Sequence, residues 1–185
     1  MFSNLRKDWR TYRGNVLAQG LWVMAVYRFG RWRYRLSIAL IRKPFSLCYK
    51  LAFKLVQVLT GIELPCEVEV GDHTRIDHFG GVIVSGYARL GAHCVLRNGV
   101  TIGLKDVDRP CAPRIGDFVD IGAGAKILGD IRIGNNVLIG ANAVVLEDVP
   151  DNSVAVGVPA RVSPKTTPPR YNVPCCRGEG DCSRS

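Results

Sequence analysis

An aliphatic residue recurs at every sixth position through the second half of the chain. The unbroken series is Ile115, Ile121, Ile127, Ile133, Ile139 and Val145. An α-helix repeats every 3.6 residues and a half-buried strand every two, so neither explains this spacing. Short repeats of fixed length are typical of a parallel β-helix, in which equivalent residues stack inside successive coils. Three hexapeptides would close one coil of about 18 residues.

Two earlier series have the same period. They consist of Leu64, Val70, Ile76 and Val82, and of Leu90, Leu96 and Ile102. A slip of two residues at Ser85-Gly86 separates them. The repeats together predict about four coils. Regular apolar spacing could also mark another all-β core, but six consecutive positions in one phase favour the β-helix.

Changes in composition predict the domain organisation. The β-helix is expected over residues 61–162, with a projecting loop at residues 104–114 (LKDVDRPCAPR) that contains two prolines. Loops on a rigid scaffold commonly carry specificity. Residues 163–185 are rich in Pro, Gly, Ser and charge, which predicts a flexible tail. The role of its cysteines (Cys175, Cys176 and Cys182) is left open.

Residues 1–60 form a basic segment with apolar residues at roughly helical spacing, interrupted at Pro44. We expect short amphipathic helices. The segment holds 12 Lys and Arg against one acid, Asp8, whereas residues 61–185 hold 13 against 15. This asymmetry argues against nucleic-acid binding along the β-helix. The helices could cap the β-helix or a neighbouring subunit, or lie on an anionic membrane surface.

The start of the chain predicts a cytoplasmic location. MFSNLRKDWR leads into charge rather than into the apolar run of a signal peptide. The longest uncharged stretch nearby, residues 14–27, is shorter than the about 20 residues that span a bilayer. Peripheral contact with the inner face of a membrane through residues 1–60 stays open. The seven cysteines do not indicate a disulfide framework, and no metal site is expected.

Histidine is the main candidate for chemistry. The chain has His73, His78 and His93. His78 follows Asp77 and could act as a general base if a carboxylate orients its second ring nitrogen. Glu63 lies 15 residues upstream, nearly one coil away, so stacking could bring the two side chains together. The alternative is a surface histidine at a coil corner.

Several motifs resemble the serine O-acetyltransferases. They are LTGIEL (59–64), IDHFGGVIV (76–84), VTIG (100–103), IGAGAKILGDIRIG (121–134) and GVPARV (157–162). These enzymes belong to the hexapeptide-repeat acyltransferases, which fold as left-handed parallel β-helices. The resemblance covers residues 55–165 well and residues 15–54 weakly. The left hand is implied by the resemblance alone, because crossovers between parallel strands are normally right-handed.

The resemblance implies an acetyl-CoA-dependent O-acetyltransferase that assembles as a homotrimer, with trimers that can pair. His78 matches the catalytic histidine, Glu63 stands where the family has its partner aspartate, and Asp77 matches the substrate-binding aspartate. The implied acetyl-CoA contacts are Gly103, Ala123, Gly124, Ala141, and the basic end from Arg161 to Lys165. Basic side chains there would suit the CoA phosphates.

The chain departs from the family at positions that bind the acceptor. The family's Arg-His pair in the projecting loop reads Cys111-Ala112 here, although Arg109 could supply a cation. The family's Asp-Pro in the helical domain is also not evident. These losses favour a sugar hydroxyl in envelope or exopolysaccharide synthesis, such as a lipid-linked sugar, with L-serine as the alternative. A β-helix zinc carbonic anhydrase that uses the three histidines is a remote alternative. A scaffold protein without activity is another.

Overall fold

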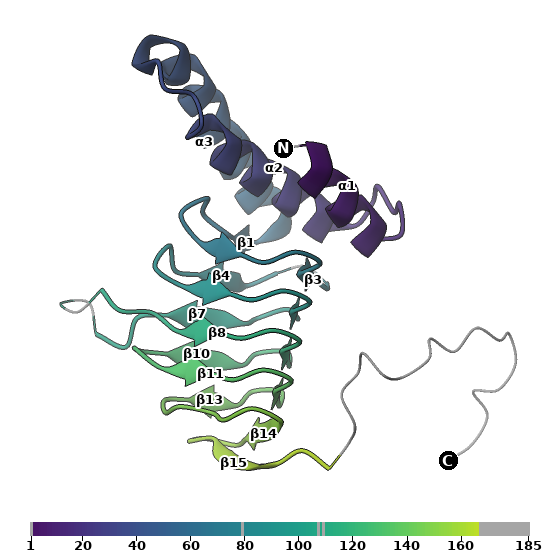
Figure 1. Ribbon diagram of the computed structural model, residues 1–185, viewed down its shortest axis with the longest axis vertical. Helices are drawn as coiled ribbons and strands as arrows, with labels where there is room; N and C mark the ends of the chain where they lie inside the picture. The colour runs from purple at the N-terminus through teal and green to yellow at the C-terminus, as the bar shows by residue number, and fades with distance from the viewer. Residues whose placement is uncertain (1, 79, 107, 109, 167–185) are drawn as a thin grey trace, which may run out of the picture.

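The chain folds as a left-handed parallel β-helix with helices packed on its N-terminal end (Figure 1). The computed structural model describes residues 2–78, 80–106, 108 and 110–166. The helices are α1 (Phe2–Thr11), α2 (Gln19–Arg33) and α3 (Ala39–Thr60). The hexapeptide period therefore predicted the architecture correctly, and the resemblance predicted its hand.

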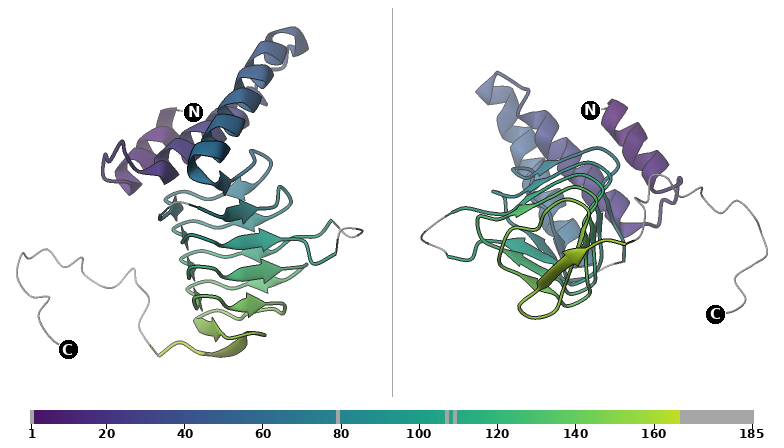
Figure 2. Two further views of the ribbon diagram at one scale, coloured as in Figure 1. Left: turned by 180° about the vertical axis from the view of Figure 1, so that it is seen from behind. Right: turned by 60° about the horizontal axis from the view of Figure 1, so that its bottom comes forward.

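Over the described residues, the strands form three sheets that make the faces of a prism, seen nearly end-on in Figure 2. The first comprises β1 (Ile62–Glu63), β4 (Val82–Val84), β7 (Thr101–Gly103), β10 (Lys126–Leu128) and β13 (Val144–Val145). The second comprises β2 (Glu69–Val70), β5 (Arg89–Leu90), β8 (Arg114–Ile115) and β11 (Arg132–Ile133). The third comprises β3 (Arg75–Ile76), β6 (Val95–Leu96), β9 (Asp120–Ile121), β12 (Leu138–Ile139), β14 (Ser153–Val156) and β15 (Arg161–Pro164).

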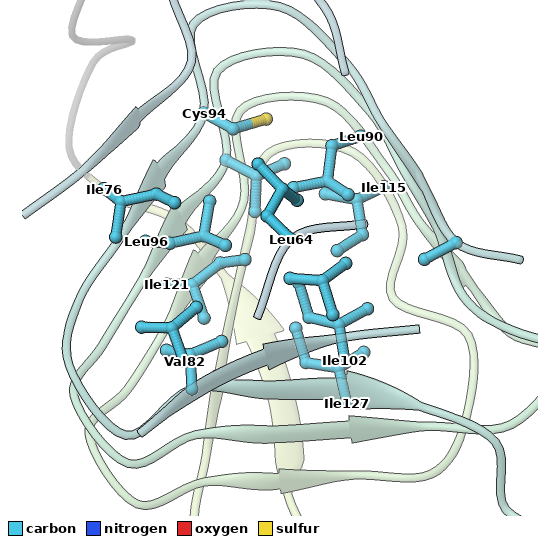
Figure 3. Close-up of a cluster of buried hydrophobic side chains, with 14 of the residues drawn as sticks. Leu64, Ile76, Val82, Leu90, Cys94, Leu96, Ile102, Ile115, Ile121 and Ile127 are labelled. Carbon is cyan, nitrogen blue, oxygen red and sulfur yellow. The ribbon is translucent and has the colours of Figure 1, made fainter. Parts of the chain in front are cut away.

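The core of the prism consists of aliphatic rows that run along its axis (Figure 3). Leu96 stacks in register with Ile121, and Ile102 with Ile127. All four are essentially inaccessible to solvent. Burying one such side chain contributes about 1.5–3 kcal/mol, so the repeated rows provide the main stabilisation of the prism.

The two-residue slip lies elsewhere than the sequence suggested. Val82 pairs with Ile62, whereas Val84 pairs with Ile102, so Val84 continues the main inner row. The extra residues therefore fall between Ile76 and Val84, not at Ser85-Gly86. The spacing could not decide this, because Val82 and Val84 both point inward and both are buried. As a result, the corner between β3 and β4, which carries His78, is enlarged.

Helix α3 continues through Pro44, where the sequence suggested a break. Pro44 is the sixth residue of the helix, so the hydrogen bond that it cannot donate lies near the N-terminal end. The helix ends at Gly61, which adopts a φ of +66° and donates its N–H to the carbonyl of Gln57 at 2.8 Å. Such a left-handed C-cap turns the chain directly into β1.

Helix α2 packs on the first coil. Its Met24 and Tyr27 are fully or almost fully buried. The Tyr27 hydroxyl donates to the carbonyl of Val68 at 2.9 Å and accepts from the N–H of Val70 at 3.2 Å. Helix α3 leaves large apolar side chains exposed, among them Leu47, Leu51, Leu55 and Val58. Along the described part of the chain, no helix combines the length and apolar character needed to cross a membrane.

The connection between β7 and β8 projects from the prism (Figure 1). At the far end, β15 pairs antiparallel with β14, so that Ser163 lies opposite Val154. The residues expected to begin the flexible tail are therefore part of the end of the β-helix up to Pro164. The tail cysteines lie outside the described residues.

Candidate functional site

His78 lies on the enlarged corner between β3 and β4. It is exposed and adopts a φ of +65°, a region that non-glycine residues occupy infrequently. The N–H of Gly80 donates to the carbonyl of Thr60 at 2.9 Å, and the carbonyl of Gly80 accepts from Gly99 at 2.9 Å. The corner is thus hydrogen-bonded to the turn above it and to the coil below it, which holds His78 in a defined position.

A cleft of about 510 Å³ separates this corner from the segment that joins α1 to α2. Its polar lining includes Arg13, Gln19, Arg75, Asp77 and His78. The cleft therefore places the two residues predicted from the IDH motif, Asp77 and His78, beside basic side chains of the helical segment and of β3.

Charged and hydrogen-bonding groups define the floor of the cleft. Arg75 Nη2 forms an ion pair with Asp77 Oδ2 at 2.9 Å. The Tyr12 hydroxyl accepts the N–H of Ile76 at 2.8 Å. Burial raises the pKa of Tyr12 well above its usual range, so this hydroxyl stays protonated at physiological pH. Tyr12 is consequently a structural contact between α1 and the β-helix rather than an acid or base.

Glu63 lies on β1, in register with Ile83 of the next coil. Its carboxylate Oε2 accepts a hydrogen bond from Gln57 Nε2 of α3 at 2.9 Å. The structure thus places Glu63 on the rung adjoining the His78 corner, beneath the end of α3. The predicted hydrogen bond between Glu63 and His78 stays a prediction.

Small residues predicted to contact acetyl-CoA follow the same edge of the prism as His78. The N–H of Gly124 donates to the carbonyl of Asn98, and the N–H of Asn142 donates to that of Ala123, both at 2.8 Å. Ala141 is exposed next to Asn142. Side chains of this size leave the backbone of the edge open to an extended ligand.

The other predicted cofactor residues are spread more widely. Gly103, at the end of β7, pairs with Leu128. Arg161 lies opposite Val156, at the edge that carries Ala141, whereas antiparallel β15 carries Lys165 back to the opposite edge. There the Lys165 ammonium donates to the side-chain oxygen of Asn136 at 2.8 Å. Arg109 lies outside the described residues.

The other two histidines do not converge on His78. His73 precedes β3, and its ring stacks on His93 with centroids 4.9 Å apart; His93 in turn stacks on Phe118 at 4.7 Å. His73 Nδ1 lies 3.0 Å from Thr11 Oγ1. No group of three potential metal ligands occurs among the described residues. The rings therefore form a stacked row along one edge, and the three histidines do not meet within one chain.

Sequence reasoning did not single out Arg13, Gln57 or Arg75. Arg75 carried a usable signal, because it lies two residues before Asp77 and extended backbone places such residues on one face. Arg13 and Gln57 carried none, since their positions depend on how α1 and α3 pack on the first coil.

Comparisons with known proteins agree with the geometry. Residues 112–147 match the family model of the bacterial transferase hexapeptide (six repeats). The chain is 35% identical over 174 residues to the serine acetyltransferase of Synechococcus elongatus, covering 88% of this chain and 68% of the relative. It is 38% identical over 138 residues to the serine acetyltransferase of Mycobacterium tuberculosis, covering 74% of this chain but 60% of that relative.

A solved structure shows the same fold. Soybean serine acetyltransferase complexed with serine superposes with a TM-score of 0.75 at 30% identity, covering 87% of this chain and 68% of the soybean chain. The chain thus spans about two thirds of the length of these relatives.

Proposed function

This chain belongs to the serine acetyltransferase family, and from that membership we propose that it is an acetyl-CoA-dependent O-acetyltransferase. It would transfer the acetyl group from the thioester sulfur of acetyl-CoA to the hydroxyl of a small acceptor. The observation that carries the proposal is the cleft that contains Asp77 and His78, at an edge continued by small residues.

In the proposed mechanism, His78 removes the proton of the acceptor hydroxyl, and the oxygen attacks the thioester carbonyl. Backbone N–H groups of the coils stabilise the oxyanion. The CoA thiolate then leaves and takes the proton from the His78 imidazolium, so the histidine is regenerated. Glu63 would orient the imidazole and stabilise its positive charge, with Gln57 holding one carboxylate oxygen.

Acetyl-CoA is proposed to lie along the edge below His78. Ala123, Gly124 and Ala141 would let its pantetheine arm approach the backbone, with Gly103 alongside. Arg161, at the end of this edge, would meet the CoA phosphates. Lys165 lies at the opposite edge, so it would reach the same cofactor only from a neighbouring protomer. This requirement fits the proposed homotrimer, whose trimers could pair.

L-Serine is the acceptor that we propose first. The relatives are named serine acetyltransferases, and the soybean structure is titled as a complex with serine. The sequence-based preference for a sugar hydroxyl depended on Cys111 and Ala112 and on the missing Asp-Pro of the helical domain, and it gains no support from these relatives. A lipid-linked sugar and membrane contact through residues 1–60 stay predictions.

The test is thiol release from acetyl-CoA by the purified protein, with L-serine and a panel of nucleotide-linked and lipid-linked sugars. We expect L-serine to support turnover and His78→Ala to lower kcat by about 10²- to 10⁴-fold. Turnover with a sugar alone would reassign the acceptor. A His78→Ala variant that keeps the normal rate would refute the mechanism, and failure of every acceptor would refute the proposed function.

A further inference from the structure

We propose that Arg75 and Arg13 form an anion-binding subsite in the His78 cleft, so that the preferred acceptor carries a carboxylate or phosphate beside its hydroxyl. This inference rests on the proposed acetyl transfer and adds the charge of the acceptor and the residues that select it.

The net charge of the residues that line the cleft favours an anionic acceptor. Among its described lining residues, Arg13 and Arg75 are basic and Asp77 is the one carboxylate, which leaves an excess of one positive charge beside His78. Arg13 is exposed and the Arg75 side chain is 41% exposed, so this excess charge is open to an acceptor that enters the cleft. A neutral or purely cationic acceptor would not compensate for it.

The ion pair between Arg75 and Asp77 leaves part of the guanidinium available to an anion. Arg75 engages Asp77 at 2.9 Å, so this carboxylate is already partly neutralised and is a weaker site for an acceptor's ammonium group alone. A guanidinium has five N–H donors, and the ion pair occupies one nitrogen. Arg75 Nε is shielded from solvent and has no hydrogen-bond partner among the described residues, so an anion would be met by the terminal nitrogens of a side chain that is 41% exposed. Guanidinium groups bind carboxylates and phosphates through paired hydrogen bonds.

Arg13 lies in the turn that follows α1. Its N–H donates to the carbonyl of Arg10 at 3.0 Å, and Gly14 donates to that of Trp9 at 3.0 Å. Both Arg13 and Gly14 have positive φ, 53° and 71°. The chain therefore turns at Arg13, and this exposed residue lines the same cleft as Arg75.

The projecting loop explains why such a subsite would be needed. The positions that the family resemblance assigns to acceptor binding hold Cys111 and Ala112, and neither carries a positive charge. Ala112 is also buried, with 6% of its surface exposed. Arginines supplied within one chain by β3 and by the end of α1 would replace that function.

The experiment compares acceptors that differ only in the anionic group. L-Serine is compared with L-serinamide, D-glycerate with glycerol, and a sugar phosphate with the free sugar, each in the acetyl-CoA thiol-release assay. We expect Arg75→Gln and Arg13→Gln to raise the KM for the anionic members by about 10- to 100-fold, with kcat changed only a few-fold. The carboxylate and phosphate arms identify which anion the subsite takes.

Arg89→Gln is the matched control, because Arg89 forms an exposed ion pair with Glu69 at 3.4 Å on another face of the prism. It should retain normal kinetics. The inference is overturned if the neutral acceptors have the same KM values as the anionic ones in the unaltered protein. It is also overturned if neither Arg75→Gln nor Arg13→Gln raises the KM for the anionic acceptors. The proposed function would stand in that case.

Binding measured without turnover distinguishes a failure of the anion subsite from a failure of the proposed acetyl transfer. Thermal melts with each probe report whether anions stabilise the protein and whether Arg75→Gln abolishes that effect. Anion-dependent stabilisation without thiol release would refute the acetyl transfer and retain the subsite. If Arg75→Gln lowers the melting temperature of the free protein, Arg13→Gln provides the decisive comparison, because its side chain is exposed.

Discussion

The N–H of Gly80 donates a hydrogen bond to the carbonyl of Thr60, the last residue of α3, at 2.9 Å. This bond joins the corner that carries His78 to the point where the helical cap enters the β-helix. The next turn of the chain, at Gly61, lies so close that a Cβ there would come within 3.1 Å of the Gly80 Cα. The helical cap is therefore part of the architecture of the candidate site and not only a cover for the coil.

The contact between Gln57 and Glu63 predicts graded losses of activity. Glu63→Gln removes the charge that would stabilise the His78 imidazolium, so kcat should fall about tenfold or more. Gln57→Leu leaves the charge on Glu63 but removes the hydrogen bond that holds its carboxylate, so the fall in kcat should be smaller. Glu67→Gln, an exposed carboxylate bonded to Tyr34 at 3.0 Å, is the control. Normal kcat for Glu63→Gln would remove Glu63 from the mechanism.

The ion pair between Asp8 and Arg28 predicts a large effect on stability. Asp8 is fully buried, and Arg28 Nε and Nη2 donate to its two oxygens at 3.0 and 3.2 Å. Asp8→Ala leaves a buried cation unpaired, so the free energy of unfolding should fall by about 3–5 kcal/mol in urea titrations. Asp72→Asn, which removes the more exposed pair with Lys7, should cost about 0–1 kcal/mol. Equal losses would contradict the assignment of Asp8 as the anchor of α1.

Gly20 permits the close approach of α2 to the cleft floor. A Cβ at this position would clash with the Tyr12 hydroxyl and the carbonyl of Ile76. Gly20→Ala should therefore destabilise the protein by about 1–3 kcal/mol and lower the melting temperature. In Gly103→Ala the nearest atom, Leu128 Cδ2, is 3.9 Å from the new Cβ, so little change is expected. A normal melting temperature for Gly20→Ala would show that α2 can shift.

The thiol of Cys94 predicts a loss of stability at alkaline pH. Burial raises its pKa from 9.0 to about 11. Because the folded state favours the protonated thiol, this contribution is fully present below pH 9 and is lost as the pH rises through about 11. The melting temperature of the protein should fall over that window, and the fall should be smaller for Cys94→Val. Valine fits because Val119, which aligns with Cys94 on the next coil, fills the same inner position. An identical pH profile for the two proteins would contradict the prediction.

The period of six identified the β-helix because it is a local property, in which each hexapeptide buries its own aliphatic residue regardless of the rest of the chain. His78 and Asp77 could likewise be found from adjacent residues in one motif. The location of the two-residue insertion could not be found from the sequence, because Val82 and Val84 both suit an inner row. Only their pairing with Ile62 and Ile102 distinguishes them.

The sequence by itself thus determined the repeating coil, the uneven distribution of charge and the candidate histidine. Only the tertiary structure decided which groups surround that histidine. Arg13 and Arg75 are 62 positions apart, and they line one cleft because Asp8 joins α1 to Arg28 of α2 while Tyr12 and Tyr27 dock these helices on the first coil. That docking depends on buried polar contacts between distant segments, and no local periodicity records such contacts.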